Sequence, residues 1–254
     1  MRDRTKEHKA TAIVLRRNDV FDADRSYLLF TREFGVIRAR GRGVRKPGSK
    51  LGGHLLLYHV ARLELIETGD WYLIGQAQLL APQELGEASL RYLGFGSLLL
   101  EPLIRLLQER EVQWDLFDGL FYTLERLAYA CQGDEPDWRI RLLVAEFLMK
   151  ALVVLGYTPN LEDCVVTNER VTSDGVGWSS ELGGVLSMEG MRTEGGRALR
   201  FQDIRSVVAL RQMVLPEFVV ERLQLPQEVG EEVVKVVLHY MQTIIGRPLS
   251  SAGV

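Results

Sequence analysis

The sequence predicts an α+β chain of two domains, in which a five-stranded β-barrel precedes a mainly α-helical domain with a small irregular insert. The hydrophobic pattern along the 254 residues predicts this order. Short β-branched and leucine-rich segments fill the first eighty residues, and apolar residues spaced three and four apart begin after Pro82. With 46% apolar residues, the chain is long enough to bury a core in each part. We expect domains at residues 1–81 and 82–254.

Turn residues divide the first part into five expected strands. These strands cover residues 10–17, 25–31, 35–44, 54–66 and 71–80, so that His54 and His59 are expected on a strand. Five short strands in about eighty residues are typical of a small barrel, and an OB-type barrel presents one face and its adjoining loops to oligonucleotides or oligosaccharides. The first domain is therefore predicted to be a small barrel.

The second part shows helical periodicity with one interruption. Gly156 is a good helix stop, and seven glycines in residues 160–196 predict an irregular insert at about residues 157–198, with two or three very short strands. Helices are expected before the insert at residues 85–108, 114–131 and 136–155, and after it at residues 201–213, 216–223 and 226–245.

The charge is divided unequally between the two parts. Residues 1–80 contain 15 Lys and Arg against 9 Asp and Glu, whereas the remaining residues contain 16 against 25, although the whole chain has a net charge of only −3. A basic first part suggests a polyanionic partner. Basic loops also occur on soluble proteins that bind no polyanion, so charge alone leaves both interpretations open.

The basic residues are densest between residues 32 and 50. Arg38, Arg40 and Arg42 alternate with apolar or small residues, so a strand would project all three guanidinium groups from one face, about 6.8 Å apart. The following turn adds Arg45, Lys46 and Lys50. Aromatic side chains in the same domain offer stacking on bases, but each is more typical of a barrel core: Tyr27, Phe34, Tyr58 and Tyr72.

Motifs for catalysis are missing. The four histidines stand in no metal-ligand spacing, and the sequence contains no H-E-x-x-H, no G-x-S-x-G and no G-x-x-x-x-G-K-[ST]. The carboxylates are dispersed as they are on solvated helix faces. We expect a protein that is not an enzyme, without a membrane span or signal peptide. With only Cys131 and Cys164 as thiols, it is expected in the cytoplasm.

Several dispersed motifs resemble the RecO family of bacterial recombination mediators. Residues 24–35 (DRSYLLFTREFG), 39–46 (ARGRGVRK) and 51–53 (LGG) resemble the family's amino-terminal domain. The segments at residues 155–159 (LGYTP) and 181–186 (ELGGVL) resemble its insert. Residues 238–249, which end in GRPL, resemble its final helix and tail. The resemblance covers nearly the whole chain.

The resemblance implies an OB barrel joined to a helical domain, without turnover of a small molecule. RecO-like proteins bind single- and double-stranded DNA and anneal complementary strands. With RecR and sometimes RecF, they load RecA onto DNA coated by single-strand-binding protein, whose acidic carboxy-terminal tail is a further expected partner. The positions that match the family's basic surface are Arg38, Arg40, Arg42, Arg45, Lys46 and Lys50, with Arg16, Arg17 and Arg25 as neighbours.

Many members of this family hold zinc with two C-x-x-C pairs in the helical domain. Here Cys164 matches the first thiol, but Thr167 stands at the second position, and Ser187 and Gly190 stand at the later pair. We therefore expect no zinc and no other cofactor.

Two other functions remain open from the sequence. The barrel could bind structured RNA, which a preference for RNA over DNA of one sequence would reveal. Alternatively, the barrel could be accessory to a metal-dependent nuclease site among the carboxylates of the helical domain, which loss of cleavage on changing one carboxylate would reveal.

Overall fold

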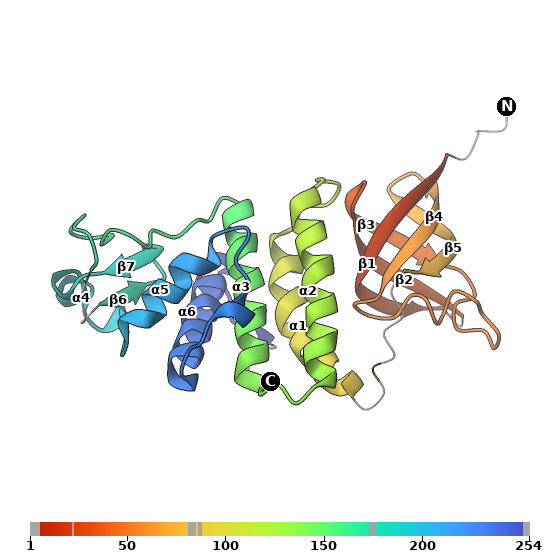
Figure 1. The fold of residues 1–254 in the computed structure, drawn as a ribbon. Helices are drawn as coiled ribbons and strands as arrows, with labels where there is room; N and C mark the ends of the chain where they lie inside the picture. The colour runs from red at the N-terminus through yellow and green to blue at the C-terminus, as the bar shows by residue number, and fades with distance from the viewer. Residues whose placement is uncertain (1–5, 22, 81–84, 86–87, 173–175, 251–254) are drawn as a thin grey trace. The chain divides into compact units, whose positions relative to one another are not determined.

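The protein is described by a computed structural model at residues 6–21, 23–80, 85, 88–172 and 176–250. Two compact units make up the chain: residues 1–96 with 103–132, and residues 97–102 with 133–254. Figure 1 shows a five-stranded barrel followed by helices and a small insert with short strands, so the predicted fold class is confirmed. The predicted domain boundary at residues 81 and 82 lies outside the described residues.

The first unit contains a closed barrel with the strand order β1-β2-β3-β5-β4. Only β3 and β5 are parallel, and the other neighbours are antiparallel. The strands are β1 (Glu7–Val20), β2 (Asp24–Thr31), β3 (Gly35–Gly41), β4 (Val60–Thr68) and β5 (Trp71–Leu79).

A bulge in β1 reverses the faces of that strand halfway along. Before the bulge, Val14 points into the barrel core and pairs with buried Leu29, and Leu15 is the extra residue. After the bulge, Arg16 pairs with Leu28 on the outer face. The bulge thereby allows a single 14-residue strand to pair first with β4 and then with β2.

Two helices belong mainly to the same unit, α1 (Ser89–Leu106) and α2 (Trp114–Gln132). The ring of Phe117 on α2 meets the edge of Phe30 on β2 at a centroid distance of 5.4 Å. On α1, Gly96 leaves room for the ring of Tyr58, because a Cβ there would lie 2.6 Å from it. Apolar burial of this kind holds the helices on the barrel.

The second unit combines helices with a three-stranded sheet of order β7-β6-β8. The long helices α3 and α6 pack together, and α5 packs on α6. Its elements are α3 (Asp137–Val154), β6 (Gly177–Ser179), β7 (Gly184–Leu186), α4 (Met188–Glu194), η2 (Gly195–Arg197), β8 (Leu199–Arg200), α5 (Ile204–Met213), η3 (Val220–Arg222) and α6 (Gln227–Ile245).

Two strand predictions were too long. The third strand ends at Gly41 because Gly43 turns the chain with a left-handed φ of +62°, so Arg42 lies in a turn and not on the strand with Arg38 and Arg40. The fourth strand begins only at Val60. Its predicted first residues, 54–59, form turns, and Tyr58 has a positive φ of 66° that a strand does not allow. The placement of His54 and His59 on a strand was therefore wrong.

The predicted helix at residues 216–223 is also wrong, since only the 3-10 turn η3 forms there. Buried Glu146 on α3 accepts a hydrogen bond from the amide of Val220 at 2.9 Å, and Lys150 donates to the carbonyl of Phe218. A helix would use these main-chain groups for its own hydrogen bonds. The side chains of α3 bind them instead, and this favours the irregular conformation.

Candidate nucleic-acid interface

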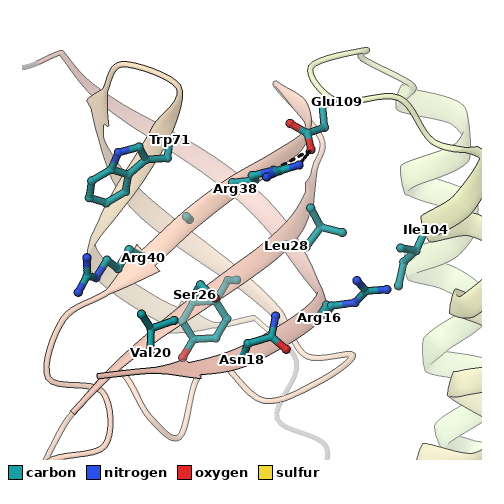
Figure 2. Close-up of a pocket in the computed structure, with 12 residues that line it drawn as sticks. Arg16, Asn18, Val20, Ser26, Leu28, Arg38, Arg40, Trp71, Ile104 and Glu109 are labelled. Atoms are coloured by element: carbon teal, nitrogen blue, oxygen red, sulfur yellow. Dashed lines mark hydrogen bonds and ion pairs between the residues drawn. The ribbon is translucent and has the colours of Figure 1, made fainter. Parts of the chain in front are cut away.

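A groove of about 590 Å³ lies on the outer face of β1, β2 and β3. Figure 2 shows side chains from these strands, from the start of β5 and from residues 104 and 109 around it. We call it the barrel groove. Its lining residues are Arg16, Asn18, Val20, Ser26, Tyr27, Leu28, Arg38, Ala39, Arg40, Trp71, Ile104 and Glu109.

The strand register arranges the outward side chains in two rows. In the first row, Arg16 pairs with Leu28, and Leu28 pairs with Arg38. In the second row, Asn18 pairs with Ser26, which pairs with Arg40. Since neighbouring strands are about 4.8 Å apart and every second residue of a strand is about 6.8 Å along, three guanidinium groups surround one patch of leucine and serine.

Arg38 is held at one edge of the groove by Glu109. Its Nε and Nη2 atoms lie 2.8 and 2.6 Å from the same carboxylate oxygen, and its side chain is 69% exposed. The chain at Glu109 is fixed to β3 by main-chain contacts, because the amide of Arg110 donates to the carbonyl of Val36 at 2.8 Å. The loop between α1 and α2 thus places the Glu109 carboxylate beside Arg38 in the groove.

Arg40 is held more firmly than Arg38. Its guanidinium group donates to Asp24 at 2.9 Å and lies 5.1 Å from the centre of the Phe21 ring, a cation–π distance. Asp24 also accepts the Gly43 amide at 2.8 Å. This backbone hydrogen bond, with that of Arg40, outweighs burial and lowers the pKa of Asp24 below its ordinary value. The ionised carboxylate therefore fixes the guanidinium group of Arg40, whose side chain lines the groove.

The other predicted cations lie outside the barrel groove. Arg25 and Arg45 share Asp19, at 2.7 and 3.5 Å. Arg17 pairs with Tyr27 on the opposite face of the sheet from Arg16. Within the described residues, the turn cations form no ion pair: Arg42, Lys46 and Lys50.

The aromatic side chains singled out from the sequence do not line the groove with their ring faces exposed. Tyr27 and Tyr72 are buried in the barrel core, and Tyr58 is buried against α1. Phe34 is half-buried against Tyr72 at a centroid distance of 6.2 Å. Two other rings lie at this surface: Trp71, which is half-buried and lines the groove, and Phe21, which is 76% exposed beside Arg40. Alternation in β5 was the available signal, because Tyr72 and Ile74 are buried and Trp71 must then point outward.

The four positions of the family's zinc loop converge in the second unit. The hydroxyl of Ser187 donates to the Cys164 sulfur at 3.4 Å, and the amide of Thr167 lies 3.5 Å from the same atom. A Cβ at Gly190 would lie 2.7 Å from that sulfur. Burial raises the pKa of the Cys164 thiol, but the hydrogen bonds from Ser187 and Thr167 outweigh it and lower the pKa to about 6.

These residues do not fit a zinc ion. Structural zinc takes four thiolate or imidazole ligands, whereas this cluster offers one sulfur, two hydroxyl groups and a glycine that is packed against the sulfur. More widely, the described residues contain no group of three or more His, Cys, Asp or Glu side chains placed to hold a metal. In the same ranges, none of the helices combines the length and apolar character that a membrane span needs.

Comparison with known proteins matches both parts of the chain. Residues 1–83 match the family model "Recombination protein O N terminal", and residues 87–252 match "Recombination protein O C terminal". Proteins called DNA repair protein RecO are similar over most of their lengths. The one from Gloeobacter violaceus is 30% identical over 81% of this chain and 76% of its own, and the one from Caldanaerobacter subterraneus is 24% identical over 92% of both. The chain therefore belongs to the RecO family.

Proposed function

We propose that this protein acts in DNA repair as a recombination mediator that binds single- and double-stranded DNA and anneals complementary strands. The observation that carries the proposal is the pair of cross-strand rows in the barrel groove, where Arg16, Arg38 and Arg40 face one side of the barrel. Membership in a family whose similar members are called DNA repair proteins supports the same conclusion.

Annealing needs no catalytic group in this mechanism. Two DNA strands repel each other through their phosphates, and arginine side chains that neutralise phosphates reduce this repulsion. Base pairing then supplies the driving force. Phosphate contacts carry little sequence information, so we expect slight sequence preference. The protein acts without turnover of a substrate and, as proposed, works in the cytoplasm.

The cations outside the groove are part of the same proposal. Arg42, Lys46 and Lys50 extend from the turn after β3, and we assign them to the DNA backbone beyond the groove. Arg17, Arg25 and Arg45 surround Asp19 at another face, where a second strand is able to bind. Two basic faces on one barrel are suited to bringing two strands together.

Charge removal with a matched control tests the proposal. One variant changes Arg16, Arg38 and Arg40 to alanine, and the control changes Arg170, Arg197 and Arg205, which are exposed arginines of the second unit. Fluorescence anisotropy with labelled single and double strands is measured across a salt series, beside strand annealing. Loss of about three phosphate contacts makes the log–log salt slope shallower by about 2 for single strands and about 3 for duplex.

The outcomes separate the alternatives. Weaker binding and failed annealing in the groove variant alone support the proposal. Equal binding by both variants refutes the barrel groove as the DNA-binding site. Tighter binding of RNA than of DNA of the same sequence supports the RNA-binding alternative. Cleavage of either strand with Mg²⁺ supports the nuclease alternative.

The proposed protein partners are RecR, with RecF where needed, RecA, and the acidic tail of single-strand-binding protein. The family supplies this part of the proposal, and we assign the acidic tail to the helical part of the chain. Titration of the full-length protein with a labelled tail peptide tests the last contact. A peptide that fails to bind at low salt, where charge attraction is strongest, would remove this partner.

A further inference from the structure

We propose that the barrel groove binds an unstacked nucleobase against Trp71, and that this contact makes the groove selective for single-stranded over duplex DNA. The inference rests on the proposed function and deepens it, because it assigns the part of the ligand that enters the groove. Phosphate neutralisation alone does not distinguish a flexible strand from a duplex in this way.

The position of Trp71 follows from the parallel pairing of β3 with β5. Ala39 pairs with Tyr72, so the preceding residues, Arg38 and Trp71, are neighbours on the outer face. The first row of the groove therefore runs across four strands, in the order Arg16, Leu28, Arg38 and Trp71. Figure 2 shows the indole of Trp71 beside the strand that carries Arg38 and Arg40. The Thr68 hydroxyl donates to the Trp71 carbonyl at 2.9 Å and fixes this end of the strand.

The groove surface is mixed in a way that suits a base as well as a phosphate. Val20, Leu28, Trp71 and Ile104 are each half-buried, and so each offers apolar surface to the groove between the arginines. A volume of about 590 Å³ is in the range of sites that enclose small organic ligands. Phosphates gain nothing from leucine or an indole, whereas the face of any base stacks on an aromatic ring.

Duplex DNA is unable to use this surface. Its bases are stacked and paired inside, so that it meets an outer barrel face mainly through phosphates and sugars. A single strand is able to turn a base outward while its phosphates on either side meet Arg38 and Arg40, which are about 6.8 Å apart along β3. The arginines should therefore serve both ligands, and Trp71 should serve only the single strand.

The experiment compares three probes of equal length: a single strand of thymidines, the same strand with abasic sites in place of bases, and a duplex. Trp71→Ala is expected to weaken binding of the thymidine strand by about 5- to 150-fold, the range for one lost stacking contact. Binding of the abasic strand and the duplex should change by less than about twofold. Trp71→Phe should retain most of the affinity, since a ring remains.

Trp114→Ala is the matched control, because Trp114 is 62% exposed at the start of α2, away from the groove lining. It should leave all three affinities unchanged. An equal loss for all three probes in Trp71→Ala, or no loss for the thymidine strand in either Trp71 variant, overturns the inference. If the native protein binds thymidine and abasic strands equally, only the base contact fails. If it binds none of the probes, the proposed function fails with it.

Discussion

Glu109 binds Arg38 through one carboxylate oxygen, which accepts a hydrogen bond from Nε at 2.8 Å and forms an ion pair with Nη2 at 2.6 Å. A carboxylate in this position occupies the donors that a phosphate would use. In the proposed function, a phosphate that binds Arg38 through Nε or Nη2 competes with Glu109, and we expect this competition to weaken DNA binding by at most the strength of one exposed ion pair.

The first prediction concerns this competition. Glu109→Gln should tighten binding of single-stranded DNA by up to about fivefold, because an exposed ion pair contributes at most about 1 kcal/mol. Glu111→Gln is the control, since the Glu111 carboxylate contacts the side chain of Gln113 at 2.8 Å. Anisotropy titrations at low salt measure both. Weaker binding by Glu109→Gln would show that Glu109 supports the DNA-bound geometry of Arg38 and does not compete with DNA.

A second prediction concerns the turn at Gly35, against which the loop between α1 and α2 packs. Gly35 has a φ of +65°, and a Cβ there would lie 2.0 Å from the carbonyl oxygen of Glu111. Gly35→Ala should therefore destabilise the fold by more than the roughly 1–2 kcal/mol that a left-handed conformation costs an L-residue. Gly48→Ala isolates this cost, because Gly48 has a φ of +79° with no atom within 4 Å of the added Cβ. Denaturant unfolding measures both, and equal losses would contradict the close approach at Gly35.

The third prediction concerns metal. Since Cys164, Thr167, Ser187 and Gly190 do not fit zinc, the purified protein should contain substoichiometric zinc by elemental analysis, and a chelator should leave its thermal midpoint unchanged. Cys164→Ala should cost on the order of 1–2 kcal/mol of unfolding free energy, because it removes a fully buried sulfur. A midpoint that falls with chelator would show that metal is bound in spite of the missing ligands.

The fourth prediction concerns pH. Burial first, and then the electrostatic effects of Arg17 and His54, lower the pKa of His59 below its ordinary 6.5. The unfolded chain therefore binds the proton more readily, so the contribution of His59 to stability is complete above about pH 6.5 and is lost as the pH falls through the folded pKa. His59→Gln should make unfolding less sensitive to pH below about 6.5. Parallel curves for both proteins would assign the acid sensitivity to other groups.

The sequence was sufficient for the order of the elements and for the outward placement of Arg38 and Arg40, because both depend on local periodicity. It was not sufficient to predict the groove residues that come from distant segments of the chain. Glu109 reaches the groove only through the packing of its loop on β3. Alternation in β5 indicates that Trp71 points outward, but only the parallel pairing with β3 places it beside Arg38.

The same limit explains the wrong elements. Residues 216–223 have helical periodicity, but Glu146 and Lys150 on a distant helix bind their main-chain groups. Tyr58 has good strand propensity, but its positive φ and its hydrogen bond to the carbonyl of Val14 turn the chain. In each case a long-range contact overrode a local preference.

The extra residue in β1, Leu15, shifts the alternation of the strand by one position, so that even-numbered residues change from the core face to the outer face. Upstream of Leu15 the even-numbered residues Ala10, Ala12 and Val14 face the core, and downstream the even-numbered Arg16 and Asn18 face the groove. Deleting Leu15 would leave these faces unchanged, because Arg16 would then follow Val14 directly on the groove side and Arg17 would remain on the opposite side. Strict alternation counted from Val14 through the bulge would instead assign Arg17 to the groove in place of Arg16, so the two arginines are told apart only when Leu15 is counted as the extra residue.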